Sequence, residues 1–506
     1  MKKLLTFVFL CTFLLIKGQT KEQVQHLDAY FTKSFQEWNI PGMAIAIVSA
    51  DSIYLSKGYG LSNLQTNKAV DEHTLFAVAS NSKAFTASAL AQLVDAGKLK
   101  WEDKVVNYLP YFKMYDNYVT QHFTIADLLS HRSGLATFSG DLLWYATSKT
   151  PKEIIQAQQY LQPVHDFRTD FGYSNISYLA AGQIIEKISG KSWKSYIQEA
   201  FLSPLNMHRT LTSTLQLTSS NNIATPYFTE NGKNNQLKWV NWDNIAPAGA
   251  IISSVHDFSK WLQLNLKEGT IHGKEYFSTK QFNQMTTPHI NFSVRKNAHK
   301  KHFSSYGMGW NLEDYEGVKV ISHAGGYDGM ISKSFFIPEK DLAVIIVTNS
   351  VNWLPGALSN KIMDVLIGDN MEDKDWSADY LVIKKRRDKQ QLEKENKLEL
   401  QRGKLSKTHL NLKEYTGTYT DQMYGNVTVE LKKGILNFQM EKTSIFHADL
   451  KHWNHQIFTF RFDTSLCSLP QGKLWFDLDK EGKINQLHID IENPDFDFTE
   501  FTFRKQ

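Results

Sequence analysis

The stretch Ser80-Asn81-Ser82-Lys83 places a serine and a lysine three residues apart where a helical pattern begins. Residues at this spacing lie on one face of a helix. Apolar side chains then recur with helical spacing at Phe85, Ala89 and Leu93, and Gly97 is the expected end of the helix. A serine hydroxyl is a weak nucleophile that needs an adjacent base. The pattern therefore favours acyl transfer, with Ser80 at a helix N-terminus that stabilises negative charge.

A second match to the same spacing shows why the context matters. Ser293-Val294-Arg295-Lys296 has serine and lysine at the same separation, but it lies in a polar stretch without an apolar helix behind it. A short motif without its structural setting is more often a chance arrangement of surface residues. We therefore assign the nucleophile to Ser80 and not to Ser293.

Two later stretches carry residues that suit the same chemistry. Tyr173-Ser174-Asn175 precedes a helical pattern that is expected to end at Gly190. His323-Ala324-Gly325-Gly326 follows a probable strand over Val318–Ile321. Glycine lacks a Cβ atom, so this last stretch allows a close approach of backbone to a ligand.

Together, the three stretches resemble the motifs of the serine β-lactamase and penicillin-binding-protein superfamily, in its class C β-lactamase, D-aminopeptidase and esterase branch. The resemblance runs in unbroken order over residues 25–367 and includes the flanking phrases at 128–135, 248–250 and 306–310. It implies an α+β fold, with an antiparallel sheet flanked by helices and an inserted helical subdomain. The strand patterns agree, because they lie early, at 42–48 and 52–55, and late, at 318–321, 334–337 and 342–347.

The resemblance also implies roles for individual residues. Ser80 would attack a carbonyl carbon, and Lys83 with Tyr173 would remove its proton, in a division that the sequence leaves open. Asn175 would orient the substrate amide and Lys83. The backbone N–H groups of Ser80 and Gly326 would form the oxyanion hole, with Gly325 in the same substrate-binding turn as His323. No cofactor and no metal ion are expected.

His323 is the informative departure from the family pattern. Many β-lactamases of the superfamily carry a lysine there, which helps to hold the carboxylate of the substrate. Histidine near neutral pH is mostly uncharged unless a neighbour raises its pKa. We therefore expect a secreted serine hydrolase acting on an ester, a D-amino-acid amide or a peptide. The alternatives are a D,D-carboxypeptidase or β-lactamase, and a catalytically silent relative that binds peptidoglycan fragments or a protein.

Length and composition set the broader limits. A chain of 506 residues is too long for one ordinary hydrophobic core, so two domains are expected. Hydrophobic residues make up 42% and charged residues 21%, which is the composition of a globular protein. Of the formal net charge of +4, three units come from Lys2, Lys3 and Lys17 near the N-terminus. The remainder gives no support for nucleic-acid binding. The expected partner is a small-molecule or peptide substrate, including a peptidoglycan-derived one, and the oligomeric state stays open.

The N-terminus has the pattern of a cleaved secretory signal peptide over residues 1–18. Lys2 and Lys3 precede an apolar run from Leu4 to Ile16, and Gly18 offers a small residue for cleavage. The run is short for a transmembrane helix, and Cys11 lies inside it without small residues just before it, so no stable membrane anchor is expected. Cleavage would leave Cys467 as the one cysteine, which excludes an internal disulfide. The expected location is the periplasm or beyond.

The C-terminal part changes from helical to strand periodicity. The charged stretch from Lys384 to Lys404 predicts a solvated helical linker. After it, alternating runs such as 427–431 and 435–440 flank turn signals such as Lys433-Gly434, and we assign the last strand to Phe496, Phe498, Phe501 and Phe503. Several short strands with regular turns favour a small antiparallel barrel. This segment resembles the lipocalin-like domain that is appended to such hydrolases.

The expected organisation is a signal peptide over 1–18, a β-lactamase-like hydrolase domain over 19–370, a charged helical linker over 371–405 and a barrel domain over 406–506.

Overall fold

The computed structural model describes residues 21–506 apart from 219–220, 231, 295–300, 369–373, 403–409, 464 and 466–468. The expected signal peptide, Cys467 and the lysine of the second serine–lysine match at 293–296 lie outside the described residues. Among the described residues, no helix is both long and apolar enough to span a membrane.

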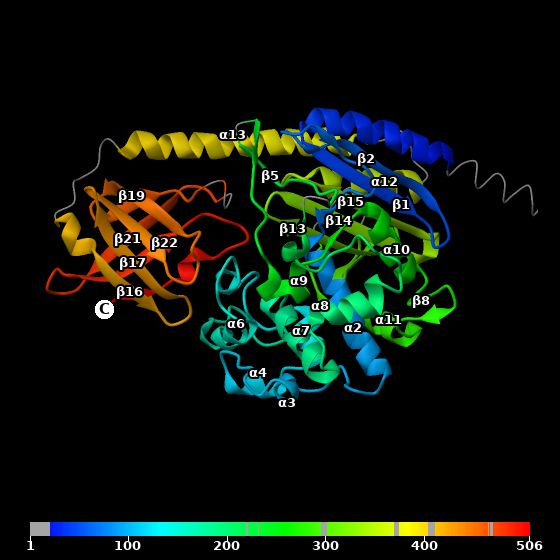
Figure 1. The fold of residues 1–506 in the computed structure, drawn as a ribbon, viewed down its shortest axis with the longest axis horizontal. Helices are drawn as coiled ribbons and strands as arrows, with labels where there is room; N and C mark the ends of the chain where they lie inside the picture. Colours follow the sequence, from blue (N-terminus) through cyan, green and yellow to red (C-terminus); the bar gives the residue numbers. More distant parts are fainter. Residues whose placement is uncertain are drawn as a thin grey trace, which may run out of the picture.

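The hydrolase part is built on a nine-stranded sheet in which neighbouring strands are antiparallel, in the order β10-β11-β12-β13-β14-β15-β1-β2-β3 (Figure 1). Strand β1 from the start of the chain pairs with both β2 and the late strand β15. The early and late strands therefore form one sheet, as the sequence pattern predicts. In sheet order, the strands are Ile290–Asn291, Ser304–Tyr306, Asn311–Tyr315, Val318–Tyr327, Met330–Ile337, Leu342–Thr348, Gly42–Val48, Ile53–Asn63 and Lys68–Ala69.

The central strands are buried on both faces of the sheet. All seven residues of β1 are buried. Because side chains alternate along a strand, Ala44 and Ala46 face one hydrophobic cluster while Met43 and Ile45 face the other. The first cluster includes α2 (Ser82–Asp95) and α10 (Val255–Leu266), and the second includes the N-terminal helix over 21–38 and α12 (Leu354–Leu366).

A helical subdomain lies between the early and late strands in sequence and on the α2 side of the sheet in space (Figure 1). Helix α2 and the neighbouring α7 form its centre and are packed against each other and against α9. The described helices of this region are α3 Val105–Tyr108, α4 Asn117–His122, α5 Ile125–Ser130, α6 Pro151–Ala157, α7 Asn175–Ser189, α8 Trp193–Ile197, α9 Ala246–Gly249 and α11 Thr279–Met285.

Helix α13, Trp376–Arg402, connects the hydrolase part to the barrel and runs along one side of the molecule (Figure 1). Its first turn is fixed to the N-terminal helix, because Trp38 Nε1 donates to Ser377 Oγ at 2.9 Å and Tyr30 Oη donates to Asp375 Oδ1 at 2.9 Å. The charged stretch thus forms one long helix that leaves the core at a defined point.

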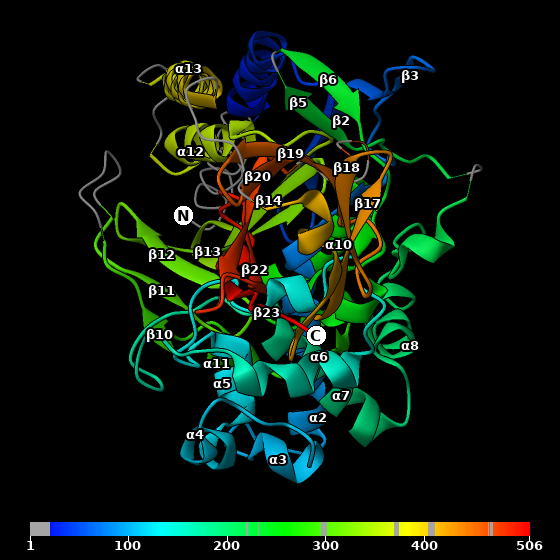
Figure 2. The same cartoon turned by 90° about the vertical axis from the view of Figure 1, so that its left-hand side faces the viewer.

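The C-terminal part is a closed antiparallel barrel of eight strands, β16 to β23, seen end-on in Figure 2. Lys433 and Gly434 both have positive φ and turn the chain from β17 into β18. Aromatic side chains such as Phe438 and Phe458 are buried in the barrel core. The strands are Gly417–Asp421, Gly425–Lys432, Ile435–Met440, His447–Asn454, Ile457–Phe460, Gly472–Leu478, Ile484–Asp490 and Phe503–Lys505.

The prediction of the last strand was wrong over most of its length. Phe498–Glu500 forms a 3₁₀ turn, η9, and strand β23 begins only at Phe503. The carboxylate of Asp497 accepts a hydrogen bond from the backbone N–H of Thr499 at 2.9 Å and so starts the turn. Phe498 and Phe501 are both buried because a 3₁₀ turn brings residues three apart onto one side.

Candidate active site

Ser80 lies in the 3₁₀ turn η1, Ala79–Asn81, immediately before α2. The preceding Ala79 is fully buried and has a φ of +46°, a conformation that costs energy for a residue with a Cβ atom and that clusters at functional sites. Asn81 fixes the turn to strand β14, since its side chain donates to Ser332 Oγ at 2.8 Å and accepts from Ser334 Oγ at 2.6 Å. Ser80 itself is only half-buried, so its hydroxyl is reachable.

Lys83 reaches Ser80 from the first turn of α2, as the three-residue spacing predicts. Its Nζ lies 3.2 Å from Ser80 Oγ, 2.6 Å from Asn175 Oδ1 and 3.0 Å from the carbonyl oxygen of Ala248. The side chain is fully buried, and this burial lowers the pKa of Lys83 to about 7, although the charge of Asp141 acts in the opposite direction. A substantial fraction of Lys83 is therefore a neutral amine near pH 7, which can accept a proton.

Tyr173 faces the same ammonium group from the loop before α7. The centre of its ring is 4.6 Å from Lys83 Nζ, and a cation at that distance from an aromatic face is attracted to it. Burial raises the pKa of Tyr173 above its usual value, while the hydroxyl of Ser80 acts to lower it. The phenol thus keeps its proton at neutral pH and can donate a hydrogen bond.

Asn175 and Asp141 extend the polar chain behind Lys83. Asn175, the first residue of α7, donates from Nδ2 to Asp141 Oδ2 at 2.6 Å while its Oδ1 accepts from Lys83. Asp141 is buried, and burial raises the pKa of its carboxyl to about 7, against the lowering influence of Trp144, Asn175 and Lys83. The sequence analysis did not identify Asp141, which stands between Gly140 and Leu142 without a recognisable motif.

Strand β13 forms the opposite wall of the site. Its pairing with β12 ends at Ser322, opposite Asn311, so the edge from His323 onward has no β12 residue beside it. Gly325 lies directly against the turn that carries Ser80: a Cβ atom there would come within 2.2 Å of the Val78 carbonyl oxygen and 3.0 Å of Ser80 N. Only glycine permits this approach. The structure thus places the glycine turn of β13, with Gly326 exposed, beside Ser80.

His323 is buried, and both of its ring nitrogens have partners within the protein. Nδ1 lies 2.6 Å from the carbonyl oxygen of Ala324, and Nε2 lies 2.9 Å from the hydroxyl of Tyr306. A carbonyl oxygen can only accept, so Nδ1 carries the proton and Nε2 accepts from Tyr306. Burial, together with the charge of Lys83, lowers the pKa of His323 to about 3. The imidazole is neutral at physiological pH.

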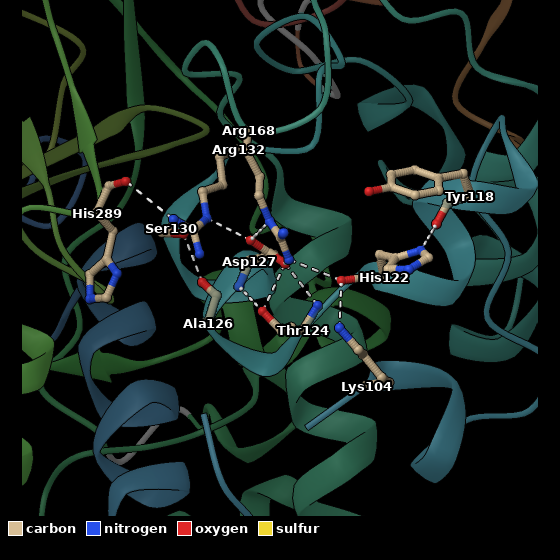
Figure 3. Close-up of polar contacts among 10 residues, drawn as sticks. All are labelled: Lys104, Tyr118, His122, Thr124, Ala126, Asp127, Ser130, Arg132, Arg168 and His289. Carbon is tan, nitrogen blue, oxygen red and sulfur yellow. Dashed lines mark hydrogen bonds and ion pairs between the residues drawn. The ribbon is translucent and has the colours of Figure 1, made fainter. Parts of the chain in front are cut away.

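The buried carboxylate of Asp127 binds two arginines, Arg132 and Arg168 (Figure 3). Asp127, whose side chain is inaccessible to solvent, accepts from Arg132 Nε at 2.5 Å and from Arg168 Nε and Nη2 at 3.0 and 2.7 Å. It also closes a capping box with Thr124 at the start of α5. Arg132 and Arg168 belong to two adjacent loops, since Arg168 N donates to the carbonyl oxygen of Arg132 at 3.0 Å, and the carboxylate of Asp127 joins their side chains.

His131, the residue that ends α5, completes this support. It has a positive φ of 58°, its carbonyl oxygen accepts from Gly172 N at 2.8 Å, and its Nδ1 accepts from Ser174 N at 3.0 Å. Its ring centre lies 4.3 Å from that of Tyr173. His131 therefore fixes the chain segment 172–174 by two hydrogen bonds and one ring contact before α7 begins.

The structure brings Ser80, Lys83, Tyr173, Asn175 and Gly325 together, with the ring of His323 6.4 Å from that of Tyr173 between centroids. Ser293 does not belong to this group and is exposed on a loop. Among the residues that the structure describes, no three His, Cys, Asp or Glu side chains are grouped so as to hold a metal ion.

Comparison with known proteins places the chain in a family. A family model described as Beta-lactamase matches residues 27–367, which is more than half of the chain. The chain belongs to the β-lactamase family. A second model, described as a domain of unknown function (DUF3471), matches residues 401–505, the region of the barrel.

The chain is similar to two further proteins by sequence and to two solved structures by fold. Unguisins hydrolase ungD' of Aspergillus campestris is 30% identical over 386 residues, covering 72% of this chain and 70% of the relative. Protein flp of Staphylococcus aureus is 25% identical over 335 residues, covering 65% and 64%. The octameric penicillin-binding protein homologue from Pyrococcus abyssi aligns over 95% of this chain and 100% of that chain, with a TM-score of 0.63 at 21% identity.

A D-stereospecific amidohydrolase from Streptomyces sp. aligns over 65% of this chain and 95% of that chain, with a TM-score of 0.52 at 20% identity. At such identities, the two structural similarities establish the shared fold alone. The family membership and the hydrolase relative make this β-lactamase-family chain a hydrolase of the serine type.

Because Lys83 is buried, the free energy of unfolding should depend on pH. In the unfolded chain, Lys83 binds a proton up to its ordinary pKa of 10.5, whereas in the folded protein it loses the proton near 7. The unfolded state thus binds more protons between these values, and the free energy of unfolding should rise with pH by up to about 1.4 kcal/mol per unit from this group. Urea unfolding between about pH 7.5 and 9.5 should show a shallower rise in Lys83→Met than in the native protein.

The matched control is Lys187→Met, which removes an exposed lysine from α7. Its slope of unfolding free energy against pH should equal that of the native protein. Equal slopes in all three proteins would show that Lys83 keeps its charge in the folded state.

Proposed function

We propose that the protein hydrolyses amide or ester bonds through an acyl-enzyme formed on Ser80. The observation that carries this proposal is the contact between Ser80 Oγ and a desolvated Lys83 amine at 3.2 Å. A nucleophile within hydrogen-bond reach of a base, with that base oriented by a third group, is the arrangement that activates serine. Asn175 is that third group, since its Oδ1 fixes the position of Lys83 Nζ.

In the first step, neutral Lys83 takes the proton of Ser80 as Oγ attacks the carbonyl carbon of the substrate. The resulting oxyanion would accept hydrogen bonds from the backbone N–H groups of Ser80 and Gly326, and loss of one such donor typically costs about 2.7–4 kcal/mol of transition-state stabilisation. Tyr173, which keeps its proton, is placed to pass a proton to the departing amine or alcohol and to recover one from Lys83. Water then attacks the acyl-enzyme by the same steps and releases the acid.

The neutral imidazole of His323 favours substrates without a carboxylate next to the scissile bond. Its ring nitrogens are occupied by Ala324 and Tyr306, so the position supplies no fixed positive charge to a substrate anion. We therefore expect esters, D-amino-acid amides and peptides to be better substrates than penicillins and D-Ala-D-Ala carboxypeptides. The name of a D-stereospecific amidohydrolase among similar structures agrees with amide hydrolysis, and that of an unguisins hydrolase with hydrolysis in general.

A substrate panel tests this order. Purified protein should be assayed with short p-nitrophenyl esters, D-alanyl amides, D-Ala-D-Ala peptides and nitrocefin, each with native protein and Ser80→Ala. We expect Ser80-dependent release from the neutral esters or amides, at a higher kcat/KM than from the carboxylate-bearing substrates. Absence of turnover and of fluorophosphonate labelling would instead identify a silent relative.

Replacing His323 by lysine should change the substrate preference more than the rate. The His323→Lys variant should raise kcat/KM for a carboxylate-bearing substrate relative to its neutral analogue by about tenfold, because charge-assisted hydrogen bonds are roughly twice as strong as neutral ones. This gain should shrink with added salt, which screens accessible charge. The His323→Gln variant, which adds no charge, serves as the control.

A native enzyme that already prefers the carboxylate-bearing analogue by about tenfold, or 1.4 kcal/mol, would contradict this assignment. Another cation would then hold the substrate carboxylate.

We also propose export with cleavage after the leader, on the pattern of residues 1–18 alone. N-terminal sequencing of protein recovered outside the cytoplasm should begin near Gln19. A chain that retains Met1 and stays in the cytoplasm would contradict export.

A further inference from the structure

The C-terminal barrel contacts the loop that supports the catalytic lysine. Glu500, at the end of the 3₁₀ turn η9 of the barrel, accepts from Ser139 Oγ at 2.7 Å and from the backbone N–H of Gly140 at 3.1 Å with each carboxylate oxygen. Tyr424 from the start of the barrel donates to the same carboxylate at 2.5 Å. The carboxylate therefore fixes residues 139 and 140 to the barrel through charge-assisted hydrogen bonds.

The residue after this anchor is Asp141, which belongs to the active site. Gly140 has a φ of +77°, a conformation suited to glycine, and turns the chain so that Asp141 begins the short turn η2. From there, Asp141 Oδ2 accepts from Asn175 Nδ2 at 2.6 Å, and Asn175 Oδ1 accepts from Lys83 Nζ at 2.6 Å. Two sets of hydrogen bonds, joined by the peptide bond between Gly140 and Asp141, thus connect the barrel to the amine beside Ser80.

A second contact reaches the other wall of the site from the same barrel segment. The ring of Phe496 lies 4.6 Å from the ring of Tyr145, between centroids. Tyr145 in turn donates from Oη to Asp328 Oδ1 at 2.6 Å, in the turn that follows the glycine end of β13. The barrel segment 496–500 therefore touches the 139–145 loop at both of its ends.

Two of the other contacts that the barrel makes are ion pairs of a different character. Arg461 of the barrel pairs with Glu230 on strand β5 (Tyr227–Glu230), and Lys394 of α13 pairs with Glu492. These side chains are substantially exposed, and exposed ion pairs contribute little to stability. Glu500 is half-buried and accepts from a backbone N–H group as well as from hydroxyls.

We propose that Glu500 is a positioning residue for the acylation step, by which the C-terminal barrel holds Asp141, and through it Asn175 and Lys83, in the geometry that activates Ser80. The inference rests on the proposed acyl-enzyme function. It assigns the barrel a part in catalysis without placing any barrel atom at the reacting centre. Small displacements of positioning groups can cost about a hundredfold in rate.

The test compares Glu500→Gln with Glu230→Gln in the full-length protein. Glu500→Gln keeps the size of the side chain but replaces one carboxylate oxygen by an amide NH₂ group. Each oxygen now accepts from two of the three donors, so the donating amide would face donors and displace the loop at residues 139 and 140. We expect kcat for the best substrate of the panel, and the rate of fluorophosphonate labelling of Ser80, to fall by tenfold or more, with KM within twofold. Glu230→Gln removes another carboxylate that joins the two parts and should keep native rates.

A double variant separates positioning from general destabilisation. If Glu500 acts through Asp141, the pair Glu500→Gln with Asp141→Asn should be no slower than Asp141→Asn alone. The melting temperature of Glu500→Gln should stay within a few degrees of the native value and above the assay temperature. Glu500→Asp, which restores a carboxylate, should recover part of the lost rate.

The proposal is overturned if Glu500→Gln keeps the native kcat, if its rate loss multiplies with that of Asp141→Asn, or if its loss is matched by Glu230→Gln. These results are distinct from failure of the proposed function. That failure would appear as hydrolysis that persists in Ser80→Ala, whatever the behaviour of the Glu500 variants.

Discussion

Ser80→Ala should abolish hydrolysis and covalent labelling. Loss of the nucleophile in a serine hydrolase lowers kcat on the order of 10⁶-fold when the group acts as a unit with its base, so activity should fall to the background of the assay. The substitution should leave the fold intact, because the Ser80 side chain is only half-buried and its turn is fixed by Asn81 instead. The measurements are kcat for the best substrate and mass spectrometry of protein treated with a fluorophosphonate.

The adduct should be found on the peptide that contains Ser80. The control is Ser293→Ala, because Ser293 shares the serine–lysine spacing but is exposed on a loop far from the site in sequence. This variant should label and turn over like the native protein. An adduct on Ser293, or labelling that survives in Ser80→Ala, would show that the nucleophile lies elsewhere.

The features that the sequence predicts correctly depend on short spacings. Ser80 and Lys83 are one helical turn apart, so their contact follows from the geometry of a helix start. The turn at Lys433-Gly434 and the strands on either side of it depend on residues within a few positions. The order of the strand patterns predicted that early and late strands join in one sheet, in agreement with the family resemblance, and the pairing of β1 with β15 confirms it.

The last barrel strand shows how a local pattern can mislead. Phe496 and Phe498 are two residues apart, as in a strand, but Phe498 and Phe501 are three apart. A separation of three does not fit strand alternation, whereas it fits the 3₁₀ turn that the structure has over Phe498–Glu500. The break in spacing was a signal available in the sequence.

Asp141 and Glu500 could not be identified from the sequence, for a different reason. Gly140 and Glu500 are 360 positions apart, and their hydrogen bond exists only because the barrel packs against the helical subdomain. Asp141 stands alone among apolar residues, where a carboxylate has no neighbour in sequence to pair with. Its role depends on Asn175, which donates to it from α7, and on Lys83 of α2, which contacts Asn175.

Lys83 and Tyr173 should behave as one proton-transfer unit. Either Lys83→Ala or Tyr173→Phe should lower kcat by about 10³-fold or more, and the double variant should be little worse than Lys83→Ala alone, because residues that act together give non-additive losses. Tyr118→Phe, which alters an exposed tyrosine outside the site, should keep the native rate. Strictly multiplicative losses would mean that the two groups act in separate steps.

The pH profile assigns the base within this unit. Burial lowers the pKa of Lys83 to about 7 and raises that of Tyr173 above its usual value. If neutral Lys83 is the base, kcat/KM should rise with pH up to about 7 and then level off. If the Tyr173 phenolate were the base, the rise would continue beyond pH 10.

Because Asp141 also titrates near 7 and interacts with Lys83, the rising limb of the kcat/KM profile reports the coupled titration of Lys83 and Asp141. In Asp141→Asn, the amine loses a nearby negative charge, so the rising limb should move to lower pH.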